Sequence, residues 1–323
     1  MKRPSSSAIR IFVSIILIIL LIYVMRGKYG QILGVLKSTN LTMFCLGTVV
    51  YTGAILLASL RLQLIARAQH ITMSFIESAS FTYIGFFFNN FLPTSIGGDV
   101  VKAYYISRKN SEKTGAYTSV FIDRAIGLVT MIFMAFVALL FAESSIVDSK
   151  MKYLIYAIAA IAALGVVFMA HEGFARKFSW LLFVVRPLET QLKKAYRSIN
   201  EYRHRTLLMA QTFIISILSQ LLFFAGMGIL IKSIGSGISA FDILLRMPII
   251  SVTSLLPSIN GLGLREGATV LLFGPLIGKA NAFAVSILVI ALLLISSVIG
   301  GLIYAFSPQF RIKLKDINKE VAL

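Results

Sequence analysis

Six long apolar stretches run along the chain, separated by polar and charged segments. They cover about 9–25, 41–60, 118–142, 152–170, 207–231 and 281–306. A helix needs about 20 apolar residues to cross a bilayer, so the pattern predicts six membrane-spanning helices. The first stretch follows a basic start that resembles a signal peptide. It runs into Arg26-Gly27-Lys28 without a small-residue cleavage site, so we interpret it as a span.

Two further apolar regions, about 73–107 and 241–278, are interrupted by proline and glycine. Irregular backbone cannot face lipid, because its N–H and C=O groups would lack hydrogen-bond partners there. We therefore predict that each region is a broken re-entrant hairpin buried within the protein. The predicted fold is an all-α, polytopic integral membrane helical bundle. It forms a single domain over residues 1–323, with about six full spans and the two broken re-entrant hairpins.

The two broken regions resemble each other in sequence. Each contains Leu-Pro, then a few small residues, two glycines and an acid, over 92–99 in the first region and 256–266 in the second. In the predicted topology the first region enters from the cytoplasm and the second from outside. This arrangement is typical of inverted-repeat transporters, whose binding site lies at the middle of the membrane between broken helices.

Composition and charge agree with a membrane protein. Of the 323 residues, 58% are hydrophobic and 14% charged, which excludes an ordinary soluble domain and a disordered chain. The net charge of +18 does not indicate nucleic-acid binding, because the basic residues lie in short segments between apolar stretches. Most fall in segments that the topology places in the cytoplasm, as the positive-inside rule requires. We therefore expect a multi-pass protein of the cell (inner) membrane with both termini cytoplasmic.

One basic segment also shows helical periodicity. After Pro187, apolar residues recur at helical spacing and Lys193, Lys194 and Arg197 lie between them. The pattern predicts an amphipathic helix over about 187–204 on the cytoplasmic surface.

The candidate site residues gather in the broken regions and at the start of the span over 118–142. Prolines free backbone carbonyls, glycines permit close backbone approach, and ionisable groups inside a membrane usually pair or line a pathway. The candidates are Asn89, Asn90, Pro93, Gly97, Gly98, Asp99, Lys102, Asp123, Arg124, Pro257, Gly261, Gly263, Arg265 and Glu266. Arg246 is a further ionisable group within apolar sequence. For Asp99, capping of a helix is the structural alternative to function.

No enzyme site is visible in the sequence. It shows no nucleophile in a recognisable elbow, no nucleotide-binding Walker loop and no carboxylate-rich metal cluster, and it holds a single cysteine, Cys45. We therefore expect a non-enzymatic protein without a cofactor or a metal.

Three motifs in order resemble the lysylphosphatidylglycerol synthase transmembrane-region family, over about 10–306. They are Asn89-Asn90-Phe91-Leu92-Pro93 with Gly97-Gly98-Asp99 and Lys102, then Asp123-Arg124-Ala125-Ile126-Gly127, then Leu256-Pro257 with Gly261-Leu262-Gly263-Leu264-Arg265-Glu266-Gly267. The resemblance implies lipid translocation by a flippase-like membrane module. In the multiple peptide resistance factor this module is fused to an aminoacyl transferase domain. The sequence after the last predicted span is too short to form that domain, so we do not expect synthase activity.

We expect membrane lipids as partners, with a phospholipid, an aminoacyl-phospholipid or a polyprenyl-phosphate-linked lipid as substrate. Arg265, Arg124 and Lys102 would meet the lipid phosphate. Asp99 and Glu266 would meet cationic headgroup parts, or hold the arginines when the groove is empty. The alternatives are an ion or small-solute transporter of inverted-repeat type, an intramembrane transferase, and a non-catalytic membrane partner of a lipid-modifying enzyme. The further partners that we expect are a second copy of the chain, forming a homo-oligomer, or a lipid-modifying enzyme.

Overall fold

The computed structural model describes the helical core of the chain. The described residues are 23, 26–91, 97–109, 113–141, 149–170, 201–202, 205–254 and 261–307. Within them every regular element is a helix and there is no strand, which confirms the all-α prediction. Nearly all of the predicted first span over 9–25 and of the predicted surface helix over 187–204 lies outside the described residues.

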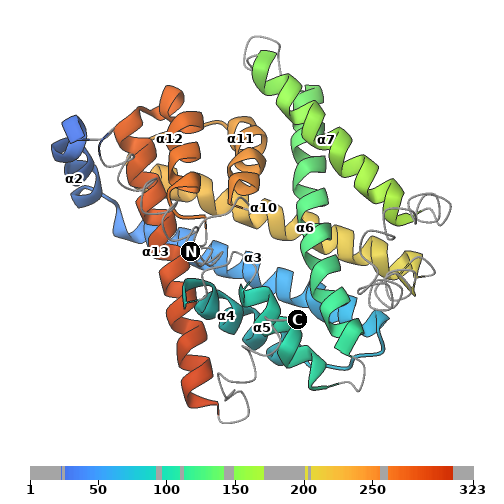
Figure 1. Cartoon of the computed structure of the whole chain (residues 1–323). Helices are drawn as coiled ribbons and strands as arrows, with labels where there is room; N and C mark the ends of the chain where they lie inside the picture. Colours follow the sequence, from blue (N-terminus) through green and yellow to red (C-terminus); the bar gives the residue numbers. More distant parts are fainter. Residues whose placement is uncertain are drawn as a thin grey trace, which may run out of the picture. The chain divides into compact units, whose positions relative to one another are not determined.

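Among the described residues, four helices are long and apolar enough to cross a membrane, which confirms a polytopic membrane protein. They are α3 (Leu41–Ala68), α6 (Lys113–Phe141), α10 (Thr206–Ser233) and α13 (Lys279–Phe306), each of 28 or 29 residues (Figure 1). At 1.5 Å per residue each is about 42 Å long, more than the hydrocarbon core requires. A fifth apolar helix, α7 (Ser149–Ala170), coincides with the predicted span over 152–170.

Both interrupted regions are pairs of helices, as the proline and glycine pattern predicts. The first consists of α4 (Phe75–Phe91) and α5 (Gly97–Ser107), and the second of α11 (Ala240–Thr253) and α12 (Leu264–Ile277). Pro93 and Pro257 themselves lie outside the described residues. The remaining elements in the described part of the chain are the 3-10 turn η1 (Arg26–Lys28) and the short helix α2 (Tyr29–Lys37).

Helix α4 begins at a capping box. The backbone N–H of Ser74 donates to Glu77 Oε2 at 2.8 Å, and the backbone N–H of Glu77 donates to Ser74 Oγ at 3.2 Å. This reciprocal pair satisfies two N–H groups that a helix start would otherwise leave without partners. Glu77 also forms an ion pair with Lys109.

The chain divides into two compact units, each built from separate stretches of sequence. Unit 1 holds Met1–Leu56, Ala79–Lys102 and Leu221–Leu323, and unit 2 holds Leu57–Ser78 and Ala103–Gln220. The single domain expected from the sequence stays a prediction.

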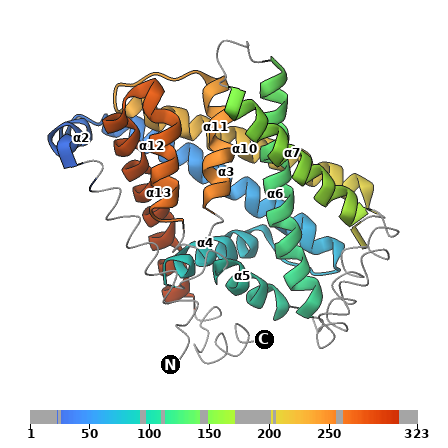
Figure 2. The same ribbon diagram turned by 45° about the horizontal axis from the view of Figure 1, so that its top comes forward.

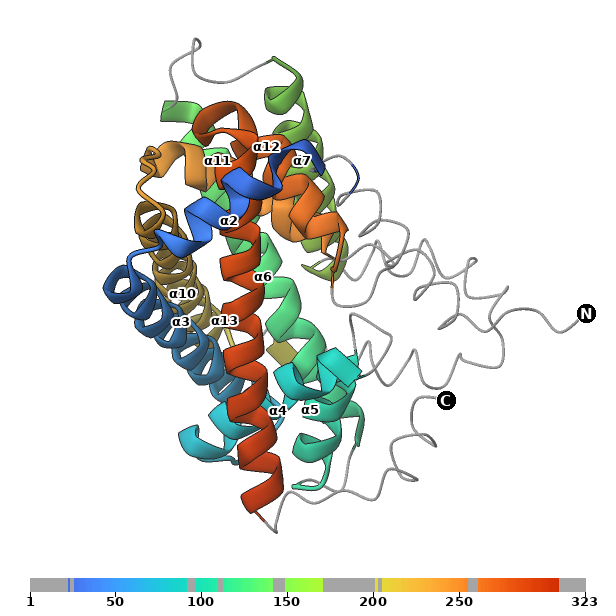
Figure 3. The ribbon, with the colours of Figure 1, turned by 90° about the vertical axis from the view of Figure 1, so that its left-hand side faces the viewer.

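Unit 1 contains the C-terminal helices and most of both helix breaks. Helix α12 packs on α11 and on α13, and α2 contacts α13 (Figures 2 and 3). Ile32 of α2 and Val270 of α12 form a small buried cluster, against which Phe283 and Ile287 of α13 pack.

Helix α13 approaches α4 without intervening side chains. A Cβ atom added to Gly300 would lie 1.9 Å from the carbonyl oxygen of Tyr83. Such contact is possible only for glycine at this position. Next to it, Tyr304 of α13 stacks on Phe87 and meets Phe88 edge-on, with ring centroids 6.1 and 5.3 Å away.

Unit 2 contains α6, α7, the later part of α3 and the beginning of α10. Tyr202 is buried here with Ile65, Ala68 and Ile122. Its hydroxyl lies 3.3 Å from the carbonyl oxygen of Ile65, to which it donates, and 3.1 Å from the hydroxyl of Ser119. These contacts fasten the chain just before α10 to α3 and α6.

Candidate functional site

The first helix break is held by an amide side chain. Asn89, near the end of α4, accepts a hydrogen bond through Oδ1 from the backbone N–H of Gly98 at 2.7 Å. A Cβ atom on Gly98 would lie 2.1 Å from the carbonyl oxygen of Gly85 and 2.7 Å from that same Asn89 oxygen. Gly98 therefore allows the start of α5 to touch α4 directly. Gly97 and Gly98 are both buried.

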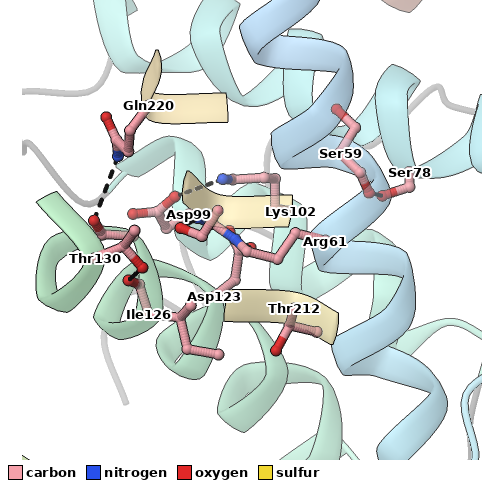
Figure 4. A network of polar contacts seen from close by, with 12 residues as sticks. Ser59, Arg61, Ser78, Asp99, Lys102, Asp123, Ile126, Thr130, Thr212 and Gln220 are labelled. Atoms are coloured by element: carbon pink, nitrogen blue, oxygen red, sulfur yellow. Dashed lines mark hydrogen bonds and ion pairs between the residues drawn. The ribbon is translucent and has the colours of Figure 1, made fainter. Parts of the chain in front are cut away.

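Two opposite charges lie in the first turns of α5. The Lys102 ammonium is 2.9 Å from Asp99 Oδ1, one helical turn away, and both side chains are more than four-fifths buried (Figure 4). A carboxylate in the first turn of a helix is favoured by the helix dipole. The pairing also neutralises both charges in a place where water is scarce.

The second helix break depends on two glycines. Gly261 and Gly263 have φ angles of +77° and +84°, which side chains other than glycine rarely tolerate. Gly263 immediately precedes α12, and its backbone N–H donates to Glu266 Oε2 at 2.6 Å. Glu266 is buried, with 4% of its surface exposed. Its carboxylate thus caps the start of α12.

The other oxygen of Glu266 binds the neighbouring arginine. Arg265 donates to Glu266 Oε1 from Nη2 at 2.6 Å and from Nε at 3.1 Å. The Arg265 guanidinium also interacts electrostatically with the phenol of Tyr51 on α3. A cation, a carboxylate and a helix start therefore meet at the second break, where Glu266 binds both the N–H of Gly263 and the guanidinium of Arg265.

A third charged pair lies in unit 2. Arg61 of α3 donates from Nε to Asp123 Oδ1 at 2.7 Å (Figure 4). It also donates from Nη1 to the hydroxyl of Ser216 on α10 at 2.7 Å. All three residues are buried. A Cβ atom on Gly127 would lie 3.2 Å from Arg61 Nη1. Glycine at that position of α6 therefore makes room for the guanidinium.

Arg61 lies just beyond the predicted span over 41–60, whose end the structure places further along the chain. In the structure α3 continues to Ala68, and only 6% of Arg61 is exposed. The reason is the carboxylate of Asp123, which lies distant in sequence. The continued apolar pattern over 62–66 is the one signal that indicates a longer helix.

The structure places the predicted site residues in two groups. Unit 1 holds Asn89, Gly97, Gly98, Asp99, Lys102, Gly261, Gly263, Arg265 and Glu266, whereas unit 2 holds Asp123 and Arg124. Asp123 is paired with Arg61, and its sequence neighbour Arg124 is half-buried. Pro93, Pro257 and the side chain of Asn90 lie outside the described residues.

Comparison with known proteins agrees with a membrane module. The profile of the family described as lysylphosphatidylglycerol synthase TM region matches residues 8–301. A curated protein of Pyrococcus horikoshii, named UPF0104 membrane protein PH1989, is 24% identical over 301 residues, which cover 83% of this chain and 88% of that protein. No solved structure matches the chain.

Proposed function

Because the chain belongs to the lysylphosphatidylglycerol synthase transmembrane-region family, we propose that it moves a lipid with a phosphate-containing headgroup between the leaflets of a membrane. The observation that carries this proposal is the Arg265–Glu266 pair, largely buried at the broken start of α12. Charged groups inside a membrane are costly and usually serve a pathway. A lipid headgroup needs such a pathway, because it cannot cross about 30 Å of hydrocarbon unaided.

The proposed mechanism exchanges protein ion pairs for contacts with the headgroup. Lys102 and Arg265 are each neutralised by a carboxylate in the structure. When a lipid enters, its phosphate replaces Asp99 and Glu266 as the partner of these cations. The released carboxylates then accept hydrogen bonds from hydroxyl or ammonium groups of the headgroup. The exchange keeps every buried charge paired along the route.

The proposal includes the arrangement of the helices in the membrane. The α4–α5 and α11–α12 pairs are re-entrant, enter from opposite leaflets and form an inverted repeat within one domain. Both chain termini are cytoplasmic, in a cell (inner) membrane. The lipid tails remain in the bilayer while the headgroup passes the two breaks. The substrate classes are phospholipids, aminoacyl-phospholipids and polyprenyl-phosphate-linked lipids.

The test is a leaflet-exchange assay on the full chain in liposomes. Headgroup-labelled phosphatidylglycerol, lysyl-phosphatidylglycerol and polyprenyl phosphate are each exposed to an outer-leaflet quencher. Wild-type protein should make inner-leaflet label accessible at least tenfold faster than protein-free vesicles do. The Asp99→Asn, Glu266→Gln double variant should return the rate to that of protein-free vesicles.

The matched control is Lys232→Ala, which removes an exposed charge from the end of α10. This variant should exchange lipid at the wild-type rate. Circular dichroism of each reconstituted variant verifies that its helices are intact. If wild type and the double variant exchange every tested lipid no faster than empty vesicles, the translocation proposal is wrong.

A further inference from the structure

Arg246, in the second turn of α11, is a buried cation outside the three pairs at the helix breaks and in unit 2. Only 6% of its surface is exposed. Its Nη1 is bonded to Oδ1 of Asp242, one turn earlier. Asp242 is fixed in turn by Ser239, whose hydroxyl donates to Asp242 Oδ2 at 2.8 Å and accepts from the Asp242 backbone N–H at 3.1 Å. The carboxylate that holds Arg246 is therefore anchored at the N-cap of α11.

One donor of Arg246 is left unused. Among the described residues, its Nε is the buried side-chain nitrogen or oxygen that has no hydrogen-bond partner. An unsatisfied buried donor on a charged group destabilises a protein, whereas an apolar side chain of similar size would not. The ion pair with Asp242 occupies Nη1 and does not need Nε. The free N–H therefore indicates that a ligand completes the site.

The geometry of the guanidinium indicates the chemistry of that ligand. The Nε and Nη2 N–H groups of arginine point in the same direction and match two oxygens of a phosphate or carboxylate group. The residues around Arg246 on α11, including Leu245, Met247 and Ile250, are buried and apolar. A ligand in this setting must bring its own oxygens, and two oxygens that accept from a guanidinium are characteristic of an anion.

We propose that Arg246 is a phosphate-binding side chain of the headgroup path, taking phosphate oxygens on its Nε–Nη2 edge while Asp242 holds Nη1. This inference rests on the proposed function for the lipid source of the phosphate. Because α11 begins after the loop that follows α10, Arg246 comes before the Arg265–Glu266 pair along the second broken region. In the proposed topology the second broken region enters from outside, so Arg246 would form a separate phosphate-binding position on the outer side of that pair.

The test measures binding by the purified full chain in detergent, with isothermal titration calorimetry. The two probes are monomeric dihexanoyl-phosphatidylglycerol and inorganic phosphate. Arg246→Lys keeps the positive charge beside Asp242 but lacks the planar Nε–Nη2 edge, and Arg246→Ala removes both. We expect each variant to bind the lipid probe about tenfold more weakly than wild type. Lys232→Ala should bind it as wild type does.

The two probes distinguish the sources of the phosphate. Loss confined to the lipid probe assigns the site to a headgroup, and equal loss for both probes assigns it to phosphate from either source. If wild type binds neither probe, or if Arg246→Lys and Arg246→Ala bind both as tightly as wild type, the inference is wrong. A purely structural role would lower the unfolding temperature of the variants and leave their affinity unchanged. The Arg246→Lys protein retains its ion pair, so the test remains available if Arg246→Ala does not fold.

Binding and transport can fail independently. Normal probe binding by Arg246→Lys, together with lipid exchange that depends on Asp99 and Glu266, would overturn this inference and leave the proposed function standing. Weakened binding by Arg246→Lys in a protein that exchanges no lipid would overturn the function and leave an anion site.

Discussion

Each buried charge named in the structure has a partner of opposite sign, but the distance to that partner in sequence varies greatly. Asp99 and Lys102 are three residues apart, and Arg265 and Glu266 are adjacent. Arg61 and Asp123 are 62 residues apart and belong to different helices. Local pairs keep a charge neutral within one element. The distant pair instead ties two spans of unit 2 together.

We predict that Asp123→Asn lowers the free energy of unfolding by about 3–5 kcal/mol, because it leaves the Arg61 guanidinium buried without a counter-charge. The Arg61→Met, Asp123→Leu double variant should be much closer to wild type, since apolar residues need no partner in this position. Chemical unfolding in detergent, followed by circular dichroism, gives the free energies.

The control for this pair is Glu201→Gln, which alters an exposed carboxylate of the same unit. It should change the free energy of unfolding by less than about 0.5 kcal/mol. An Asp123→Asn protein as stable as this control would mean that the Arg61–Asp123 pair contributes nothing.

Sequence could predict the local pairs better than the distant one. Asp99, Lys102, Arg265 and Glu266 stand out because charge interrupts apolar sequence near glycines. Nothing in the sequence near Arg61 indicates that Asp123 is its partner, because the two side chains meet only when α3 and α6 pack together. Arg246 is recognisable in the sequence as a charge within an apolar stretch, but its unused Nε is visible only in the side-chain contacts.

At the scale of elements, several helices begin where a side chain accepts a hydrogen bond from a backbone N–H group at the helix start. Glu77 caps α4, Asn89 binds the start of α5, and Glu266 caps α12. Sequence predicts the position of both breaks, because proline and paired glycines cannot continue a helix smoothly. It does not reveal that Glu266 has two roles, since the second depends on where its two carboxylate oxygens point.

The start of α4 should respond to acid. Partial burial acts to raise the pKa of Glu77, but hydrogen bonds from Lys109 and Ser74 outweigh it and hold the pKa below its ordinary value of 4.5. A carboxyl with a lowered pKa stabilises the folded state fully above pH 4.5. That contribution is lost as the pH falls through the pKa of the folded protein. Unfolding temperatures measured from pH 7 to pH 3 should therefore decrease more for wild type than for Glu77→Gln.

Parallel acid profiles for wild type and Glu77→Gln would contradict this assignment. Glu201→Gln again serves as the reference, and its profile should follow that of wild type.

The close contact between α4 and α5 should leave no room for a side chain at Gly98. We predict that Gly98→Ala lowers the free energy of unfolding by about 1–3 kcal/mol, because its Cβ would collide with the Gly85 carbonyl. Gly267→Ala is the matched control, since a Cβ at that helical position meets nothing within 4 Å. Alanine there should stabilise α12 by up to about 1 kcal/mol. Equal effects of the two alanines on chemical unfolding would show that the close approach is unimportant.

At the scale of the whole molecule, contacts between helix ends indicate which ends share a side of the membrane. In unit 1, the backbone N–H of Asn40 before α3 donates to the carbonyl of Ser233 at the end of α10, at 2.7 Å. Asn281 at the start of α13 donates to the hydroxyl of Ser236 at 3.1 Å. The beginnings of α3 and α13 and the end of α10 therefore lie together.

Labelling of introduced cysteines tests this topology. In a Cys45→Ser background, Ser38→Cys and Ser236→Cys should react with an impermeant maleimide added outside intact cells. Ser307→Cys, which follows α13, should react only after the cells are opened. Labelling of Ser307→Cys from outside would place the end of α13 on the wrong side and refute the proposed orientation.

The way the two units are distributed along the chain has a consequence for biosynthesis. Unit 1 takes residues from the beginning, middle and end of the sequence, and unit 2 takes the residues between them. An N-terminal fragment that stops before residue 206 would hold all of α4 and α6 but would lack α10, so neither unit would be complete. Such a fragment would hold Arg61 and Asp123 but would lack Ser216, the second partner of the Arg61 guanidinium.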